Sequence, residues 1–319
     1  MELRPGLFWA RTQLPFKPGH INVWLLPDAD GWTVIDPGFD SPDHRDAFLA
    51  LLASLGDPSV ARVLVTHAHV DHCSIAGWLC EISGARLAMA RTEWLVARLA
   101  GSPEDILSHR VLYRSTGCPV AWLDGVADYR LWFAANYAGL PARYERLVDD
   151  GTIGIGGRQW RISIGGGHAP EQVMLHAPGD GILIAADHLL PRINPSVMLR
   201  AEEPWSDPIG DGLASLDLCG RLPDGTLICP SHGEPCFGIG AIVARTIAHH
   251  RARIETVRGM LRAGTTGYDV LRALHPGGRD FANSRIAILE SLALLVHLER
   301  QGDAISVFEH DGVRRFSPR

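Results

Sequence analysis

The chain has 319 residues, a formal net charge of −6 at pH 7, 46% hydrophobic residues and 21% charged residues. These values are typical of a soluble globular protein, and they exclude collagen-like, coiled-coil and largely disordered chains. The negative charge disfavours a dedicated nucleic-acid-binding protein, whose surface is usually basic. The six cysteines form no CxxC pair, which favours a reducing, cytoplasmic compartment. We expect no signal peptide and no membrane span, because no long uncharged apolar stretch is present.

The first third of the chain predicts short strands that alternate with helices. Hydrophobic runs bounded by turn residues predict strands over residues 7–10, 21–26, 32–35, 62–66 and 86–89. Apolar residues at helical spacing predict helices over 41–55 and 75–82. Ser41 as N-cap and Pro42 at the first helical position mark where the first of these helices begins.

The remaining two thirds divide into a helical insertion, a second set of strands and a tail. Residues 92–144 are predicted to be an insertion of several helices. Further strands are expected over 159–164, 172–176, 181–186 and 226–229, and a helix over 211–221. The tail predicts helices over 241–263, 268–274 and 282–300 and a hairpin over 303–316, an order typical of a winged-helix-like module. Glycines at 238–240 indicate a boundary between a first domain, residues 1–238, and a C-terminal domain, residues 239–319.

The segment 66–72, Thr-His-Ala-His-Val-Asp-His, carries the strongest chemical pattern in the chain. It directly follows a buried strand, and the carboxyl ends of strands commonly carry the sites of α/β proteins. His67 and His69 alternate along extended backbone and therefore project to the same side, whereas Asp71 and His72 can face a second ion. Three imidazoles and a carboxylate suit zinc, iron or manganese.

Three more candidate ligands follow later strands. His168 comes after three glycines that permit a close backbone approach, Asp187 follows the apolar run 182–186, and His232 follows the strand at 226–229. Each would be weak alone, because a single histidine after a strand is more often structural. Their shared position at strand ends favours one common site.

In these residues the chain resembles the metallo-β-lactamase-fold hydrolases, and within them the glyoxalase II-like branch. The HxHxDH motif is intact, and the later elements resemble the segments 167–171 and 231–234, the acid Asp187 and an early Asp-x-Gly turn at 36–38. The resemblance covers about residues 5–238. It implies an α/β fold, an αββα sandwich with metal ions at one edge.

The resemblance also assigns the ligands. It gives His67, His69 and His168 to one ion and Asp71, His72 and His232 to the other, with Asp187 bridging them. Asp36 would orient a ligand histidine. Two divalent ions are therefore expected, with zinc favoured over iron and manganese. Two such ions can share a water and lower its pKa, so that a metal-bound hydroxide attacks, and Asp71 would act as general acid and base.

The substrate is less well defined than the chemistry. We expect a small-molecule substrate, anionic in character, and favour an ester or thioester of the hydroxyacylglutathione hydrolase type. The alternatives are a phosphodiesterase or single-strand nuclease, and a metal-binding, DNA-associated regulator that is not an enzyme. His249, His250 and Arg253 on the basic helix 241–263 are candidate anion contacts, although a solvated arginine face is the simpler interpretation. A homodimer is left open.

Overall fold

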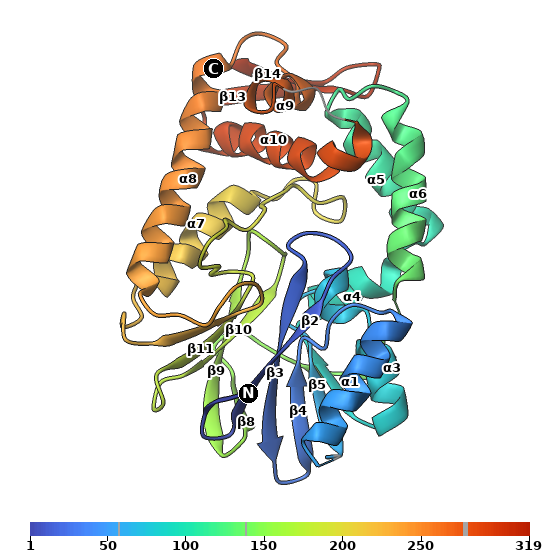
Figure 1. Ribbon diagram of the computed structural model, residues 1–319. Coiled ribbons are helices and arrows are strands. Elements are labelled where there is room, and N and C mark those ends of the chain that lie inside the picture. The colour runs from blue at the N-terminus through green and yellow to red at the C-terminus, as the bar shows by residue number, and fades with distance from the viewer. Residues whose placement is uncertain (57, 138, 277–279) are drawn as a thin grey trace.

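Two β-sheets packed face to face form the lower half of the molecule (Figure 1). The computed structural model describes residues 1–56, 58–137, 139–276 and 280–319. The first sheet contains β1 (Glu2–Arg4), β2 (Leu7–Gln13), β3 (His20–Asp28), β4 (Gly31–Ile35), β5 (Val60–Leu64), β6 (Arg86–Met89) and β7 (Glu145–Arg146), in that order. The second contains β12 (Leu227–Pro230), β11 (Ile182–Ala186), β10 (Gln172–Ala177), β9 (Arg158–Gly165) and β8 (Thr152–Ile155). The strands from β4 to β7 are parallel, and so are β11 and β12.

Helices cover the outer face of each sheet. The first sheet carries α1 (Pro42–Ser54), α2 (Val70–Cys73), α3 (Ala76–Ser83) and α4 (Arg91–Leu99), and the second carries α7 (Pro208–Cys219) and the start of α8 (Ile239–Met260). Between the sheets, Trp24 and Trp160 are fully buried in one apolar cluster that draws residues from both. The predicted αββα sandwich is therefore confirmed.

Local sequence explains most of these elements. The Ser41 side chain accepts a hydrogen bond from the amide of His44, and Pro42 opens α1, as the capping residues predict. Three short strands, β1, β7 and β8, were not predicted. Each lies at an edge of its sheet and is too short, or too interrupted by glycine, to show the alternation typical of a strand.

The upper half of the molecule is built from helices of the insertion and of the tail. The insertion provides α5 (Pro103–Ser115) and α6 (Trp122–Ala135), and the tail provides α8, α9 (Gly267–Leu274), α10 (Phe281–Gln301) and the hairpin β13 (Ala304–Phe308) to β14 (Arg314–Pro318). One apolar cluster joins both, and it includes Leu112, Val126, Val257 and Leu292. The insertion and the tail therefore stabilise each other across the predicted boundary at 238.

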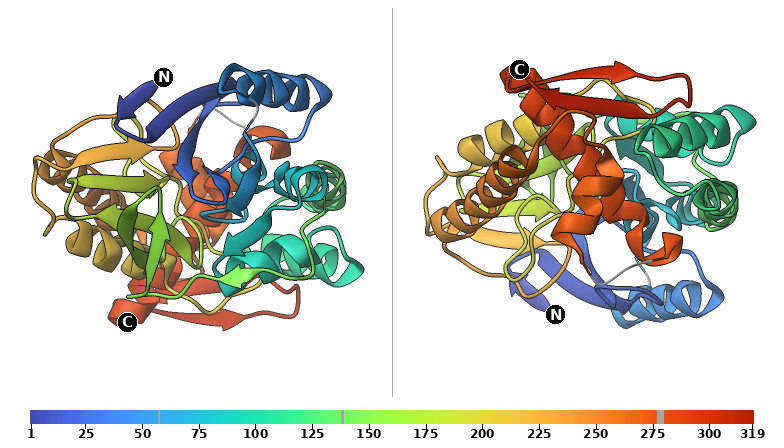
Figure 2. Two further views of the ribbon diagram at one scale, coloured as in Figure 1. Left: turned by 90° about the horizontal axis from the view of Figure 1, so that it is seen from below. Right: turned by 90° about the horizontal axis from the view of Figure 1, so that it is seen from above.

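Helix α10 lies at the centre of this upper half, seen from above in Figure 2. By length and hydropathy it could span a membrane, but 61% of its apolar window is buried inside the protein. Its burial by α8, α9 and the insertion identifies it as a core helix. The tail elements follow one another in the predicted order, three helices and then a hairpin, and an isolated β-bridge joins Thr265 to Phe316 of that hairpin. The winged-helix-like character of the tail stays a prediction.

Candidate metal centre

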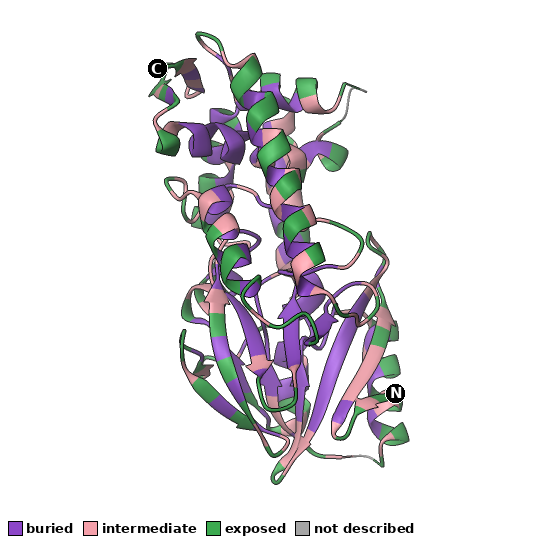
Figure 3. Cartoon of the chain, turned by 90° about the vertical axis from the view of Figure 1, so that its left-hand side faces the viewer, coloured by how far each residue is buried: buried purple, intermediate pink, exposed green. Residues whose placement is uncertain are grey.

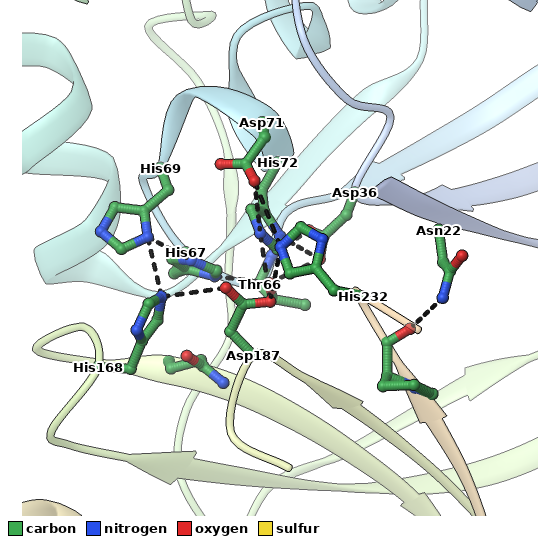
Figure 4. Close-up of polar contacts among 12 residues, drawn as sticks. Asn22, Asp36, Thr66, His67, His69, Asp71, His72, His168, Asp187 and His232 are labelled. Atoms are coloured by element: carbon green, nitrogen blue, oxygen red, sulfur yellow. Dashed lines mark hydrogen bonds and ion pairs between the residues drawn. The ribbon is translucent and has the colours of Figure 1, made fainter. Parts of the chain in front are cut away.

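The ends of four strands bring seven potential ligands to one edge of the sandwich (Figure 4). The HxHxDH segment follows β5, and α2 turns Asp71 and His72 back toward the strand end. His168, Asp187 and His232 follow β9, β11 and β12. Gly167 has a positive φ of 111°, and a Cβ there would lie 2.7 Å from the Cα of Gly212, so the turn before His168 requires glycine.

The first group consists of His67, His69, His168 and Asp187, whose ligand atoms all lie within 4.8 Å of one another. His69 Nδ1 lies 2.9 Å from His67 Nε2 and 3.0 Å from His168 Nε2. The Oδ2 atom of Asp187 is 3.2 Å from His168 Nε2. Three imidazole nitrogens and one carboxylate oxygen thus surround a single point.

The second group consists of Asp71, His72 and His232. His232 Nε2 lies 3.4 Å from Asp71 Oδ2 and 3.4 Å from the Oδ1 atom of Asp187. His72 Nε2 lies 3.6 Å from the same Asp187 oxygen. Asp187 therefore directs one carboxylate oxygen at each group, the arrangement expected of a bridging ligand.

These residues fit divalent cations. Among the described residues, His72 Nε2 and Asp187 Oδ1 are buried without a hydrogen-bond partner, and such atoms are stabilised when they bind a ligand. Nitrogen and carboxylate donors lie about 2.0–2.2 Å from zinc, so ligand atoms around one ion are separated by about 3.3 Å. The distances within both groups are close to that value. The donor set suits zinc, iron or manganese.

Comparison with known proteins places this geometry in a family. The model of the metallo-beta-lactamase superfamily matches residues 16–232, which include all seven side chains. The chain belongs to the metallo-beta-lactamase superfamily. It is 27% identical to the probable metallo-hydrolase YqjP of Bacillus subtilis over 279 residues, 83% of this chain and 84% of YqjP. The superfamily assignment and the two ligand groups identify a metallo-hydrolase with candidate metal-binding sites.

Solved structures share the whole architecture. The crystal structure of a beta-lactamase domain protein from Burkholderia ambifaria is 33% identical, with a TM-score of 0.89 over 100% of this chain and 94% of that chain. A metallo-beta-lactamase family protein from Thermus thermophilus is 25% identical, with a TM-score of 0.83 and full coverage of both chains. A shorter similarity, 36% identity over 78 residues, relates this superfamily member to the hydroxyacylglutathione hydrolase of Ectopseudomonas mendocina, covering 24% of this chain and 28% of that one.

Hydrogen bonds to oxygens outside the centre orient four of the five candidate ligand histidines. Four histidines place Nδ1 beside an oxygen and leave Nε2 directed at the centre. The oxygens are Thr66 Oγ1 for His67 at 3.0 Å, Asp36 Oδ2 for His72 at 2.9 Å, the Ser196 carbonyl for His168 at 2.8 Å and the His20 carbonyl for His232 at 2.7 Å. His69 is reversed and presents Nδ1. In the four histidines that present Nε2, such contacts select the tautomer that binds a metal.

Asp36 connects several of these contacts. Its Oδ1 accepts from the Thr66 amide at 2.8 Å, and its Oδ2 lies 2.7 Å from Thr66 Oγ1 and 2.9 Å from His72 Nδ1. The residue adopts a φ of 50°, which is rare outside glycine, so the surrounding contacts hold a strained backbone in place. The structure thus places Asp36 against the candidate ligand His72, and its role in orienting a bound ligand stays a prediction.

Asp36→Asn should weaken metal binding about 10- to 100-fold, the range typical when a residue that hydrogen-bonds a metal-binding histidine is replaced. Oδ2 faces two donor groups, and an amide nitrogen at that position could accept from neither. A competition titration with a chromophoric chelator measures the change. Asp40→Asn is the matched control, because Asp40 pairs with Arg45 at the start of α1. Unchanged affinity in Asp36→Asn would refute this role.

Burial and charge set the protonation of the metal-free histidines. Burial and the neighbouring imidazoles lower the pKa of His67 and His69 well below its usual value. Burial also acts to lower the pKa of His232, but the carboxylates of Asp187 and Asp71 outweigh it and raise that pKa to about 10. Since a metal ligand must be a neutral imidazole, metal binding at the second group should release a proton at neutral pH.

The sequence did not predict two residues that contact the loops of the metal centre, Glu93 and Arg200. Glu93 accepts hydrogen bonds from the amides of Ala68 and Glu171, both at 2.8 Å, and so joins the loops that carry His69 and His168. Arg200 Nη2 lies 2.6 Å from His69 Nε2 and 2.9 Å from the His168 carbonyl. No motif marks these residues, because their contacts depend on how distant loops pack.

The predicted substrate contacts on α8 lie elsewhere. As far as the structure describes the chain, the cavity that opens on the metal centre has none of His249, His250 and Arg253 in its lining. Arg253 pairs with Glu290 of α10 at 3.1 Å, and His250 is buried. Figure 3 shows the exposed face of α8 directed outward. The sequence of this helix suggested a ligand site, but in the fold Arg253 pairs with α10 and His250 is buried.

The buried His250 should make the folded protein less stable in acid. Burial, followed by His249 and Arg253, lowers its pKa to about 4. The unfolded chain takes up this proton near pH 6.5, so stability falls as the pH drops from 6.5 toward 4, by up to about 3 kcal/mol. His250→Leu should lose that much less between pH 7 and pH 4.5 in urea unfolding. His310→Gln changes a histidine at an exposed turn and should lose as much stability as the unaltered protein. If the free energy of unfolding fell equally with pH in the unaltered protein and both variants, His250 would not be the source of the acid sensitivity.

Proposed function

We propose that this chain is a dinuclear metal-dependent hydrolase that cleaves an ester or thioester. The observation that carries the proposal is Asp187, whose two carboxylate oxygens face the two ligand groups separately. Zinc is the favoured ion. Two divalent ions at these groups would polarise the scissile carbonyl and lower the pKa of a bound water.

The residues of the chain would supply binding and proton transfer. Asp71 reaches the centre from the cavity side, 3.4 Å from His232 Nε2, and its side chain is 13% exposed. It is therefore placed to hold the proton of the attacking water and to deliver it to the leaving group. Arg200, which lines the same cavity beside His69, is placed to hold a polar group of the substrate.

Thioesters are favoured for two reasons. The segment that is 36% identical to a hydroxyacylglutathione hydrolase supports a thioester substrate. The cavity that contains the candidate ligands is also walled by aromatic and aliphatic side chains of α6 and α10, which suits an acyl group better than a polyanionic nucleic acid. A DNA-binding role is disfavoured because much of α10, the third helix of the tail, is buried in the protein.

A substrate panel tests the proposal. The metal-loaded protein is given thioesters, oxygen esters, lactones, phosphodiesters and short RNA, with metal content measured on the same sample. We expect thioesters or esters to be cleaved fastest and chelation to abolish cleavage. Faster cleavage of phosphodiesters or RNA would favour the nuclease instead, and tight, salt-dependent DNA binding without turnover would favour the regulator.

A further inference from the structure

A cavity of about 1420 Å³ extends from the metal centre into the space between the sandwich and the upper helices. Its inner end contains His69, Asp71, His168, Asp187 and His232. Its outer walls come from the loop after β2, from α6, from α10 and from the segment 190–202. This volume exceeds the 300–1,000 Å³ typical of small-molecule sites, so a two- or three-carbon acyl group would leave most of it empty.

An aromatic wall runs along one side of this cavity. We define it as Phe16, Phe39, Tyr129 and Trp132. The ring centroids of Phe16 lie 5.3 Å from Phe39 and 6.3 Å from Trp132, and Trp132 lies 6.2 Å from Tyr129. Phe39 shares an apolar cluster with Val70, the neighbour of Asp71 in the chain. The wall therefore continues from the metal centre onto α6.

Apolar side chains are also exposed inside the cavity. Trp132 on α6, Ile193 after β11 and Ile286 on α10 are 43%, 45% and 41% exposed, and all three line the cavity. They come from three separate segments, so a single amphipathic helix does not explain them. Converging apolar groups that stay open to water mark a binding site for an apolar ligand.

Two arginines beside the wall are already engaged. Arg130 is held by Asp105 through two contacts of 2.9 Å. The guanidinium carbon of Arg285 lies over the Tyr129 ring, 4.9 Å from its centroid. An aliphatic chain along this wall would leave both arginines with their present partners, whereas a polyanion would gain little from them.

We propose that the cavity binds the acyl chain of a medium-chain thioester, about eight to ten carbons long, along the aromatic wall; this rests on the hydrolase proposed above. The carbonyl would sit at the metal centre and the methyl end between α6 and α10. Water would add its oxygen to the carbonyl carbon, the carbon–sulfur bond would break, and the departing sulfur would take a proton. A carboxylic acid and a free thiol result.

Chain length is the direct test. The metal-loaded protein is assayed with acetyl, butanoyl, hexanoyl, octanoyl and decanoyl thioesters of N-acetylcysteamine. Burial of each methylene contributes up to about fourfold, so the four extra methylenes of octanoyl could raise kcat/KM over butanoyl by up to about 250-fold. We expect a rise of about tenfold or more, because the cavity is partly open to water. Trp132→Ala and Ile286→Asn should each lower kcat/KM for octanoyl about tenfold and leave acetyl within about twofold. Trp205→Ala, which changes a tryptophan that is 71% exposed and lies outside the cavity lining, should leave both substrates unaffected.

A binding measurement separates this inference from the proposed reaction. Calorimetry on the metal-free protein should show decanoate binding that is weakened in Trp132→Ala and unchanged in Trp205→Ala. Thioester cleavage that is equally fast at every chain length would overturn the acyl-chain site and leave the hydrolase standing. Decanoate binding with no cleavage of any ester or thioester would overturn the hydrolase alone. Absence of both would overturn both.

Discussion

Asp187→Ala is expected to bind less than one divalent ion per chain and to lose at least about four orders of magnitude in turnover. The carboxylate contributes an oxygen to both ligand groups, so its removal leaves each group one donor short. It also removes the carboxylate beside His168 in the first group and leaves the second group with the carboxylate of Asp71 alone. Metal analysis after gel filtration and a thioester assay on the same sample measure both losses.

His69→Ala should lose metal and turnover in the same way, because His69 Nδ1 is central to the first group. Asp180→Ala is the matched control. Asp180 lies just before β11, at the opposite end from Asp187, and pairs with Arg158 at 3.1 Å. It should keep full metal content and rate. If Asp187→Ala or His69→Ala retained both, the ligand assignment would be wrong.

Arg130→Met is expected to lower the free energy of unfolding by about 3–5 kcal/mol, because it removes one partner of a buried ion pair. The Arg130 and Asp105 side chains are only 6% and 4% exposed and join α6 to α5. Asp105 also lies 3.1 Å from His109 Nδ1 and accepts from the Gly101 amide. Burial raises the pKa of Asp105, but the contacts with His109 and Arg130 outweigh it and lower that pKa to about 2, so without Arg130 a buried carboxylate stays poorly compensated.

Urea unfolding at pH 7 measures this loss. The double variant Asp105→Leu, Arg130→Met should recover much of it, because the uncompensated charge is then gone. Arg110→Met is the control: Arg110 and Asp124 are 3.9 Å apart, with side chains 38% and 85% exposed, and an exposed pair contributes at most about 1 kcal/mol. Equal effects of Arg130→Met and Arg110→Met would contradict the structural role of the buried pair.

The part of the site that is local in sequence could be predicted. His67, His69, Asp71 and His72 lie within six residues directly after a strong strand pattern. Their spacing and their position at the end of that strand were enough to predict a metal site. His168, Asp187 and His232 needed the order of elements that the superfamily resemblance supplied. The αββα arrangement followed from the same resemblance, and the shared core of Trp24 and Trp160 confirms it.

The substrate side of the site could not be predicted. Trp132 and Ile286 line one cavity only because the insertion and the tail share a core, and no local pattern encodes which faces of their helices point into that cavity. The candidate anion contacts on α8 were misplaced for the same reason, because tertiary packing decides which side chains of a helix face the cavity. Arg253 resembles an anion contact in the sequence, but in the fold Glu290 of a distant helix pairs with it.

The number of divalent ions bound per chain, measured together with thioester cleavage, tests the dinuclear hydrolase most directly. The metal-free protein is titrated with zinc, freed of excess metal and analysed for zinc, and cleavage of octanoyl thioester is followed at each point. We predict two ions per chain and a rate that rises until the second ion is bound. Full cleavage by the metal-free protein, or a protein that binds no zinc, would contradict the proposed centre.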